Sequence, residues 1–147
     1  MITKLEEIIQ TVQGQPRKKL AVAYAQDSHT LEAVGAAVDM GIVEAILVGD
    51  RDEIERVCMA DEIDPEKFSV IDQKSDVACV ATAVKMIHDG MADILMKGLV
   101  STDKYMRGIL DKEFGLLPPK GVLSHVAVLE LPMYHKLLLV SDVAVIP

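Results

Sequence analysis

The chain has 147 residues, half of them hydrophobic, and a formal net charge of −8 at pH 7. This length is sufficient for one domain with a substantial core. The negative charge and the lack of a long basic run exclude nucleic acid and anionic membranes as main partners. The longest apolar runs are far shorter than the ~20 residues of a membrane helix, and the first thirteen residues lack the apolar core of a signal peptide. We therefore expect a protein of the cytoplasm.

Cysteine and histidine usage gives no indication of a metal site or a disulfide. Cys58 and Cys79 lie within apolar, helix-like patterns and lack CxxC spacing. The four histidines are dispersed and form no HxxxH or Cys/His pattern. Reduced, buried cysteines and the absence of a bound metal are therefore expected.

Apolar periodicity and cap residues predict alternating helices and strands along most of the chain. Helices are expected over 3–13, 28–40, 50–60, 75–88 and 101–110. Strands are expected over 20–24, 45–48, 68–71 and 92–96. Asp50 and Glu53 have the spacing of a capping box. After a loop over 115–121, residues 122–131 and 137–143 are two further strand candidates, separated by a turn around Pro132.

Strands that alternate with helices of this length indicate parallel βαβ units. The predicted fold class is therefore α/β, with a mainly parallel sheet in a three-layer αβα sandwich. Ligands of such sheets bind beyond the carboxyl ends of the strands, which places residues 27–28, 49–50, 72–75 and 97–102 on one rim. The first three segments are interpreted as helix caps, and the fourth is the candidate site.

The stretch from Ala92 to Arg107 has the pattern of an anion site. A short apolar strand leads into a Lys-Gly turn and then into a helix that Ser101 or Thr102 can cap. The amides at a helix start are unpaired and the helix dipole is positive there, so Lys97 and Arg107 beside them could hold a phosphate.

A second interpretation of Arg107 is equally compatible with the spacing. Asp103 and Asp111 lie four residues on either side of it, which is the pattern of a solvated ion-pair ladder on a helix surface. The residues alone leave both interpretations open.

The end of the chain is unusual for a finished domain. A very apolar strand, Leu137–Asp142, is followed only by Val143 and Ala144–Pro147, and no helix covers it. Uncovered apolar strands favour aggregation, so we expect either a fragment or association with another chain.

Several segments together resemble the phosphate acetyl/butyryl transferase family, most closely its phosphate butyryltransferases. The segments are Leu95–Thr102 continuing through Arg107 to Leu110, Leu123–Val128, Leu139–Ala144 and, less distinctively, Ala45–Asp50. The resemblance extends over nearly the whole chain, and its Lys-Gly-Leu-Val-Ser-Thr stretch is fairly specific.

The resemblance implies a transferase that converts acyl-CoA and phosphate to acyl phosphate and CoA. It also implies a homodimer of two-domain α/β subunits, similar in fold to isocitrate and isopropylmalate dehydrogenases, with the active site in the interdomain cleft. Residues 1–147 would be one α/β domain, the N-terminal portion of such an acyltransferase, with the second domain absent. Its catalytic residues would lie beyond Pro147. No bound cofactor or metal is implied, and coenzyme A enters as a thioester substrate.

Few functional positions can be carried over from the resemblance. Arg107 matches the arginine that relatives place on the phosphate, and Ser101, Thr102 and Lys97 match the turn before it. Ser124 matches a serine on the cleft side, and Asp142 matches an acidic residue at a strand end, which makes both candidate cleft residues. Many relatives carry an Asn soon after this Asp, whereas Val145 and Ile146 follow here.

Three functional hypotheses remain. The first is a butyryl-CoA:phosphate acyltransferase represented by its phosphate-side domain, which need not be active alone. The second, a nucleotide-linked dehydrogenase, is disfavoured because no GxGxxG follows the first strand, where residues 24–29 read Tyr-Ala-Gln-Asp-Ser-His. The third is a non-catalytic anion-binding or assembly module that uses the uncovered strand as its interface.

Overall fold

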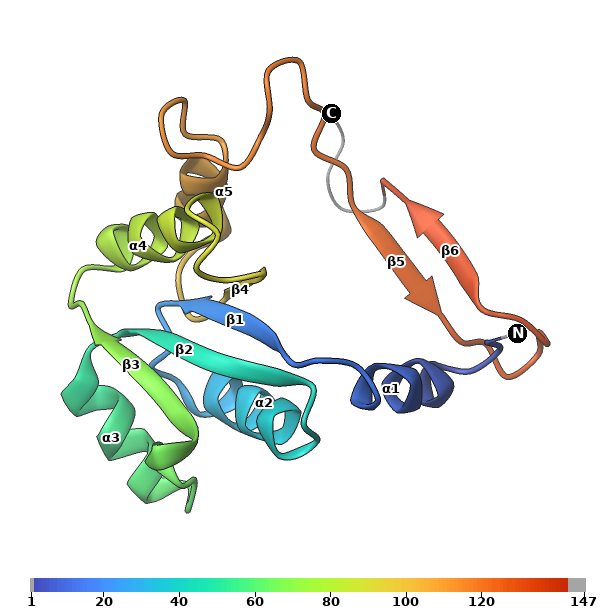
Figure 1. The fold of residues 1–147 in the computed structure, drawn as a ribbon, viewed down its shortest axis with the longest axis horizontal. Coiled ribbons are helices and arrows are strands. Elements are labelled where there is room, and N and C mark those ends of the chain that lie inside the picture. Colours follow the sequence, from blue (N-terminus) through green and yellow to red (C-terminus); the bar gives the residue numbers. More distant parts are fainter. Residues whose placement is uncertain (1, 143–147) are drawn as a thin grey trace. The chain divides into compact units, whose positions relative to one another are not determined.

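The computed structural model describes residues 2–142, which divide into two compact units (Figure 1). The sheet unit is Arg17–Leu116. The hairpin unit combines Met1–Pro16 with Leu117–Pro147, of which residues 2–16 and 117–142 are described. The expectation that the whole chain forms one domain of a longer two-domain acyltransferase stays a prediction.

The sheet unit is built from four strands and four α-helices in alternation. The strands are β1 (Lys18–Ala23), β2 (Val43–Gly49), β3 (Phe68–Asp72) and β4 (Ile94–Lys97). The helices are α2 (Ser28–Asp39), α3 (Arg51–Ala60), α4 (Asp76–His88) and α5 (Thr102–Ile109), with a short 3₁₀ helix, η1 (Pro65–Lys67), before β3. All strand pairs are parallel, in the order β3-β2-β1-β4, which confirms the predicted α/β fold class.

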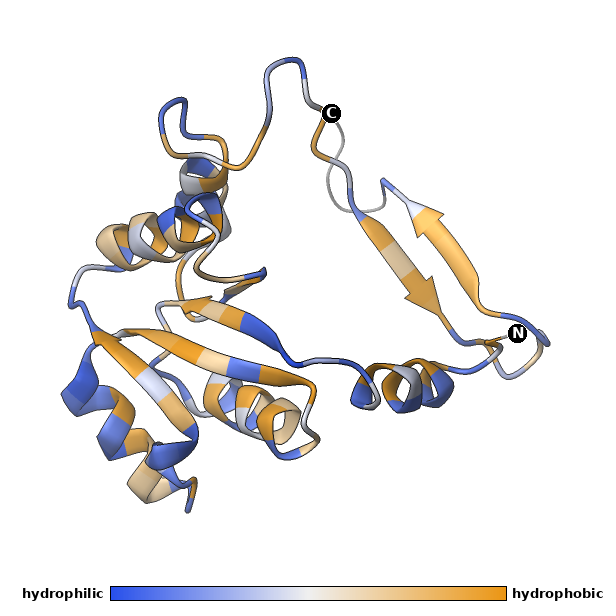
Figure 2. Ribbon diagram, viewed as in Figure 1, coloured by the Kyte–Doolittle hydropathy of each residue, from blue (hydrophilic) through white to orange (hydrophobic). Residues whose placement is uncertain are grey.

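Side chains of β1 alternate between the two faces of the sheet and define three layers. Leu20 and Val22 belong to the core that the sheet forms with α2 and α3. Ala21 and Ala23 belong to the opposite core, which contains the buried residues of α4. Because successive strand residues point to opposite faces, a run of apolar residues is required where both faces are covered. Figure 2 shows this apolar colouring along most of β2.

Aspartates begin two of the helices, as their positions predict. The Asp27 carboxylate accepts a hydrogen bond from the Thr30 amide at 3.0 Å. Asp50 caps α3 by accepting from the Asp52 amide at 3.1 Å. The capping box expected from the Asp50–Glu53 spacing does not form, because Asp50 accepts from the Asp52 amide and not from the Glu53 amide, and the Glu53 carboxylate pairs with Arg56 at 2.6 Å.

Both cysteines are free and fully buried, as expected from their apolar surroundings. Burial raises the pKa of the Cys58 thiol, and it raises the pKa of the Cys79 thiol to about 11. The Cys79 Sγ–H donates to the Gln73 carbonyl at 3.2 Å. Both groups are therefore neutral thiols at physiological pH and have the character of small apolar residues.

The hairpin unit contains one helix and one antiparallel pair of strands. These are α1 (Leu5–Gln13), β5 (Val126–Leu129) and β6 (Leu138–Ser141). Both strands are shorter than the predicted segments 122–131 and 137–143, and Val143 lies outside the described residues. The strands form their own two-stranded sheet and do not extend the parallel one.

No helix within residues 2–142 is long and apolar enough to cross a membrane. No group of three or more His, Cys, Asp or Glu side chains in the same range could hold a metal ion.

Candidate functional site

The strand order creates one topological switch point in the sheet unit. β1 lies between β2 and β4, and the chain adds β2 and β3 on one side before it returns to add β4 on the other. In open α/β sheets, ligands bind in the crevice outside the carboxyl ends of the two strands at such a point. The crevice here is flanked by the residues that follow β1 and by the turn that follows β4.

The turn from Lys97 to Ser101 is anchored to the last residue of β1 and to the residue that follows it. The Gly98 amide donates to the Ala23 carbonyl at 2.9 Å, and the Leu99 amide donates to the Tyr24 carbonyl at 3.1 Å. Val100 is 2% exposed and belongs to the core on the α4 side. Backbone bonds and a buried anchor therefore fix the turn on which the candidate site residues lie.

Lys97 is a half-buried cation at this turn. Its Nζ donates to the Gly98 carbonyl at 3.3 Å. Within the described part of the chain, no carboxylate is close enough to form an ion pair with it. Lys85 and Lys104, by contrast, pair with carboxylates of neighbouring residues on the same unit. A partly buried ammonium with one neutral acceptor retains hydrogen-bonding capacity for an anion.

Ser101 caps α5, and Thr102 is its first residue. The Ser101 Oγ accepts from the Lys104 amide at 3.4 Å. This arrangement leaves the earlier amides of the helix without intrahelical partners and directed outward from its N-terminus. Lys97 and the N-terminus of α5 are thus separated only by the anchored turn, as the sequence predicts.

Arg107 forms an ion pair with Asp103, one of its two predicted partners. Its Nε lies 3.0 Å from the Asp103 Oδ2, and the two side chains are 79% and 69% exposed. Asp111 instead accepts from the amides of Glu113 and Phe114, which lowers the pKa of its carboxyl group. Arg107 and Lys97 share no acceptor among the hydrogen bonds and ion pairs of residues 2–142.

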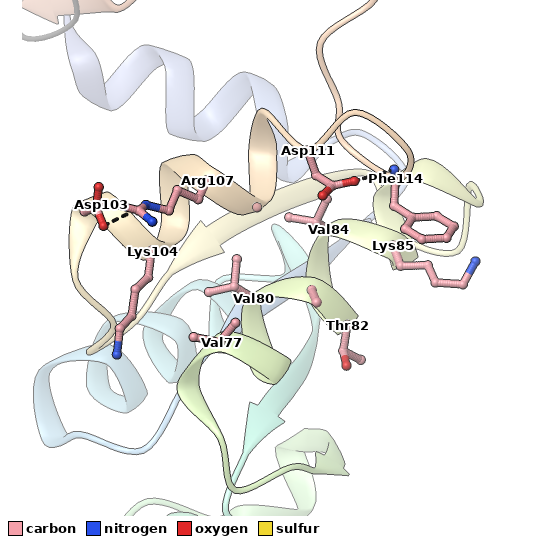
Figure 3. A pocket seen from close by; sticks show the side chains of 12 residues that line it. Val77, Val80, Thr82, Val84, Lys85, Asp103, Lys104, Arg107, Asp111 and Phe114 are labelled. Carbon is pink, nitrogen blue, oxygen red and sulfur yellow. Dashed lines mark hydrogen bonds and ion pairs between the residues drawn. The ribbon is translucent and has the colours of Figure 1, made fainter.

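Arg107 lies on the rim of a groove between α4 and α5 that sequence reasoning missed (Figure 3). The groove has a volume of about 660 Å³, and Val77, Val80 and Val84 supply apolar side chains from α4. At Gly108 an added Cβ would lie 2.4 Å from a Val80 methyl group, so the absence of a side chain allows close packing of the two helices. The one available signal was the apolar pattern that nearly encircles residues 75–88.

Ser124 and Asp142 lie together in the hairpin unit. The Ser124 Oγ donates to the Asp142 Oδ1 at 2.7 Å, and the Asp142 amide donates to the His125 carbonyl at 2.8 Å. These bonds join residues next to the paired ends of β5 and β6, where Val126 lies opposite Ser141. No local pattern predicts this contact, because the two residues are 18 positions apart in the sequence.

An all-parallel αβα sheet, with a cationic turn and a helix N-terminus at its switch point, defines an α/β protein of the class that places its ligands at such a point. The family described as Phosphate acetyl/butaryl transferase matches residues 3–81, which is more than half of the chain. The chain belongs to this family.

Individual relatives agree with this assignment. The chain is 42% identical to a phosphate butyryltransferase from Clostridium acetobutylicum over 98% of its own length and 48% of the relative's. It is 36% identical to a phosphate acetyltransferase from Thermotoga maritima, over 94% of its own length and 46% of that relative's length. Among solved structures, a branched-chain phosphotransacylase from Enterococcus faecalis V583 matches with a TM-score of 0.65 and 25% identity, over 86% of this chain and 42% of that one. The chain therefore spans about half the length of the curated relatives it matches.

Proposed function

We propose that this chain is the phosphate-side portion of an acyl-CoA:phosphate acyltransferase that converts butyryl-CoA and phosphate to butyryl phosphate and CoA. The names of the relatives support this reaction class. The structural observation that carries the proposal is Lys97, a half-buried cation without a carboxylate partner in the described residues, one turn from the N-terminus of α5.

The proposed reaction requires a bound and oriented phosphate. A phosphate oxygen attacks the thioester carbonyl carbon, a C–O bond forms, the C–S bond breaks, and the sulfur leaves with the electron pair as CoA thiolate. Lys97 and the first-turn amides of α5 hold the phosphate and offset its negative charge while it approaches the thioester. Thr102 and the Ser101 backbone complete the cradle.

Arg107 joins the site by exchanging Asp103 for phosphate. Its present ion pair is highly exposed, and exposed pairs of this kind contribute only about 0–1 kcal/mol, so the exchange costs little. A guanidinium binds two oxygens of one phosphate through parallel N–H donors, which a carboxylate partner would otherwise occupy.

The rest of the proposed enzyme follows the family resemblance. We place its catalytic residues beyond Pro147, its location in the cytoplasm, and its active form as a homodimer. Ser124 and Asp142 are proposed to face the cleft as a hydrogen-bonded pair.

The test is phosphate-dependent release of CoA from butyryl-CoA, measured on the purified native protein. Lys97→Ala and Arg107→Ala are each expected to raise the KM for phosphate at least about tenfold, because each removes a charged phosphate ligand. Lys67→Ala is the matched control, since Lys67 pairs with Asp39 away from the turn. Unchanged phosphate kinetics in Lys97→Ala would contradict the assigned site.

The alternative is a non-catalytic anion-binding or assembly module. One observation favours it: Val126, Val128 and Leu139 are exposed on one face of the β5–β6 hairpin. The module would bind inorganic phosphate and form a defined oligomer without any turnover of butyryl-CoA. Sedimentation together with the CoA-release assay separates the two functions.

A further inference from the structure

Tyr24 has a backbone conformation that its residue type seldom adopts. It directly follows β1, and its φ is +61°, in the left-handed region. The side chain of an L-residue crowds the backbone there, and residues other than Gly, Asn and Asp occupy this region only when their surroundings enforce it.

Hydrogen bonds to β2 and to the turn that follows β4 enforce this conformation. The Tyr24 amide donates to the Val48 carbonyl of β2 at 2.8 Å. The Tyr24 carbonyl accepts from the Leu99 amide, in the turn after β4, at 3.1 Å. One residue in the left-handed conformation therefore ties the end of β2 to the candidate phosphate turn.

Gly98 allows the turn to approach Tyr24 closely enough for these bonds. A Cβ at this position would lie 2.4 Å from the Tyr24 carbonyl oxygen and 2.9 Å from the Ala23 carbonyl oxygen. Both obstacles are backbone oxygens that already accept hydrogen bonds from the turn, so neither can move away without breaking a bond. Position 98 therefore excludes any side chain.

The contacts of Tyr24 with the turn lie beyond the β1–β4 ladder. The β1–β4 ladder ends where Ala23 pairs with Lys97, and the contacts of Tyr24 with Gly98 and Leu99 come after that pair. The sheet does not need them for its own pairing. They fix the direction of the chain between the end of β4 and Ser101.

We propose that Tyr24 and Gly98 form a backbone clamp that positions Lys97 and the N-terminus of α5 for phosphate. This inference rests on the proposed function and assigns two positioning residues to its site. The clamp holds the cation and the helix amides at a fixed separation, so the phosphate does not have to order the turn on binding. Preorganisation of this kind improves affinity because binding no longer carries the entropic cost of ordering.

A matched pair of substitutions tests the clamp. Tyr24→Asn and Tyr24→Val remove the same aromatic ring and leave side chains of similar size. Asn tolerates the left-handed region, whereas a β-branched residue does not. A difference between the two variants therefore reports the backbone conformation and not the lost packing, and Gly98→Ala serves as a third, more severe variant.

Two measurements are made on the full chain at room temperature, after circular dichroism shows that each variant is folded. Hydrogen exchange of the Leu99 amide is expected to be at least about tenfold faster in Tyr24→Val and Gly98→Ala, and unchanged within about twofold in Tyr24→Asn. The Kd for inorganic phosphate, measured by phosphorus NMR, is expected to rise at least about fivefold in Tyr24→Val and to remain near wild type in Tyr24→Asn.

Each outcome decides a different point. Wild-type exchange at Leu99 in Tyr24→Val overturns the clamp itself. Faster exchange with equal phosphate Kd in the Val and Asn variants overturns its positioning role. If the wild-type chain binds no phosphate and Lys97→Ala leaves the KM for phosphate unchanged, both the proposed site and the positioning role are overturned. The exchange data still show whether the clamp exists.

Discussion

The two units of this chain differ in how their apolar residues are used. Every buried apolar side chain of residues 2–142 lies in the sheet unit, between Leu20 and Val100, in two cores on opposite faces of the sheet. The hairpin unit has no buried residue among positions 2–16 and 117–142. The sheet unit therefore contains the interactions that specify its own fold. The hairpin unit depends on its backbone hydrogen bonds, since it buries no apolar side chain of its own among the described residues.

Hydrogen bonds within the hairpin unit, both local and long-range in sequence, hold its segments together. The Glu130 carboxylate accepts from the Leu5 amide at 2.9 Å and so ties the hairpin to the start of α1. Glu7 accepts from the Thr3 and Lys4 amides at the same helix start. A two-stranded hairpin is only marginally stable by itself in water. Figure 2 shows hydrophobic colouring along most of β5 and β6. Substitutions should therefore have very different effects in the two units.

The largest difference is expected for leucine truncation. Leu47→Ala removes a fully buried side chain from β2 and should lower the free energy of unfolding by about 3 kcal/mol, through lost burial and the cavity left behind. Leu139→Ala on β6, where the side chain is 72% exposed, should change it by less than about 0.5 kcal/mol. Urea unfolding followed by far-UV circular dichroism measures both. Equal losses would show that the hairpin face is covered in solution.

An intermediate difference is expected at two glycines. Gly108→Ala places a methyl group 2.4 Å from Val80 and should cost about 1–3 kcal/mol through overpacking between α4 and α5. In the hairpin unit, the nearest atom to the new methyl group of Gly14→Ala is the Thr11 carbonyl oxygen at 3.8 Å. This substitution should leave the free energy of unfolding unchanged or raise it by up to about 1 kcal/mol.

A double-mutant cycle identifies the cause at Gly108. If the clash with Val80 is responsible, Gly108→Ala should cost less in a Val80→Ala background than in the wild type. Equal costs in both backgrounds would assign the effect to something other than this contact.

The smallest difference between the two units is expected in how their stability falls at acid pH. A hydrogen bond from the Lys19 amide and the nearby Lys18 lower the pKa of the Asp93 carboxyl group in the sheet unit. In the hairpin unit, hydrogen bonds from the Thr3 and Lys4 amides lower the pKa of Glu7. A carboxyl group with a lowered pKa stabilises the fold above its unfolded-state pKa, and this contribution is lost as the pH falls through the folded-state pKa.

The melting temperature measured between neutral pH and about pH 3 tests this expectation. In a plot of melting temperature against pH, Asp93→Asn should reduce the fall of the sheet unit's melting temperature at acid pH. Glu7→Gln should leave that fall unchanged and affect only the helical signal of α1. The reverse pattern would contradict the independent behaviour of the two units.

The fold of the sheet unit was predictable because its signals are local. Apolar runs marked β1 to β4, and Asp27, Asp50 and Ser101 marked helix starts as the structure has them. The hairpin was less predictable, since apolar alternation indicates strands but does not indicate which strands pair. The predicted strand 20–24 ends one residue early because Tyr24 leaves the extended conformation.

The candidate site was predictable only in part. A cation and a capping serine around a Lys-Gly turn are visible in the sequence, and the structure places Lys97 and Ser101 accordingly. The spacing around Arg107 could not distinguish an ion pair from an anion site, because both use the same charges at the same intervals. Neither the left-handed Tyr24 nor its approach to Gly98 has a local signal, since both arise from bonds between segments distant in sequence.

The central position of β1 also determines the order in which the sheet can assemble. β1 can pair with β2 as soon as Ala45 is available opposite Leu20, but it pairs with β4 only when Ile94, 74 positions after Leu20, has been synthesised. Long-range parallel pairing of this kind is slow because the intervening chain must first be ordered. During synthesis the three-stranded β1–β2–β3 portion therefore precedes β4, and the Lys97 turn is among the last parts of the sheet unit to form. We therefore expect a nascent chain to acquire the geometry of the candidate phosphate turn only after the rest of the sheet has folded.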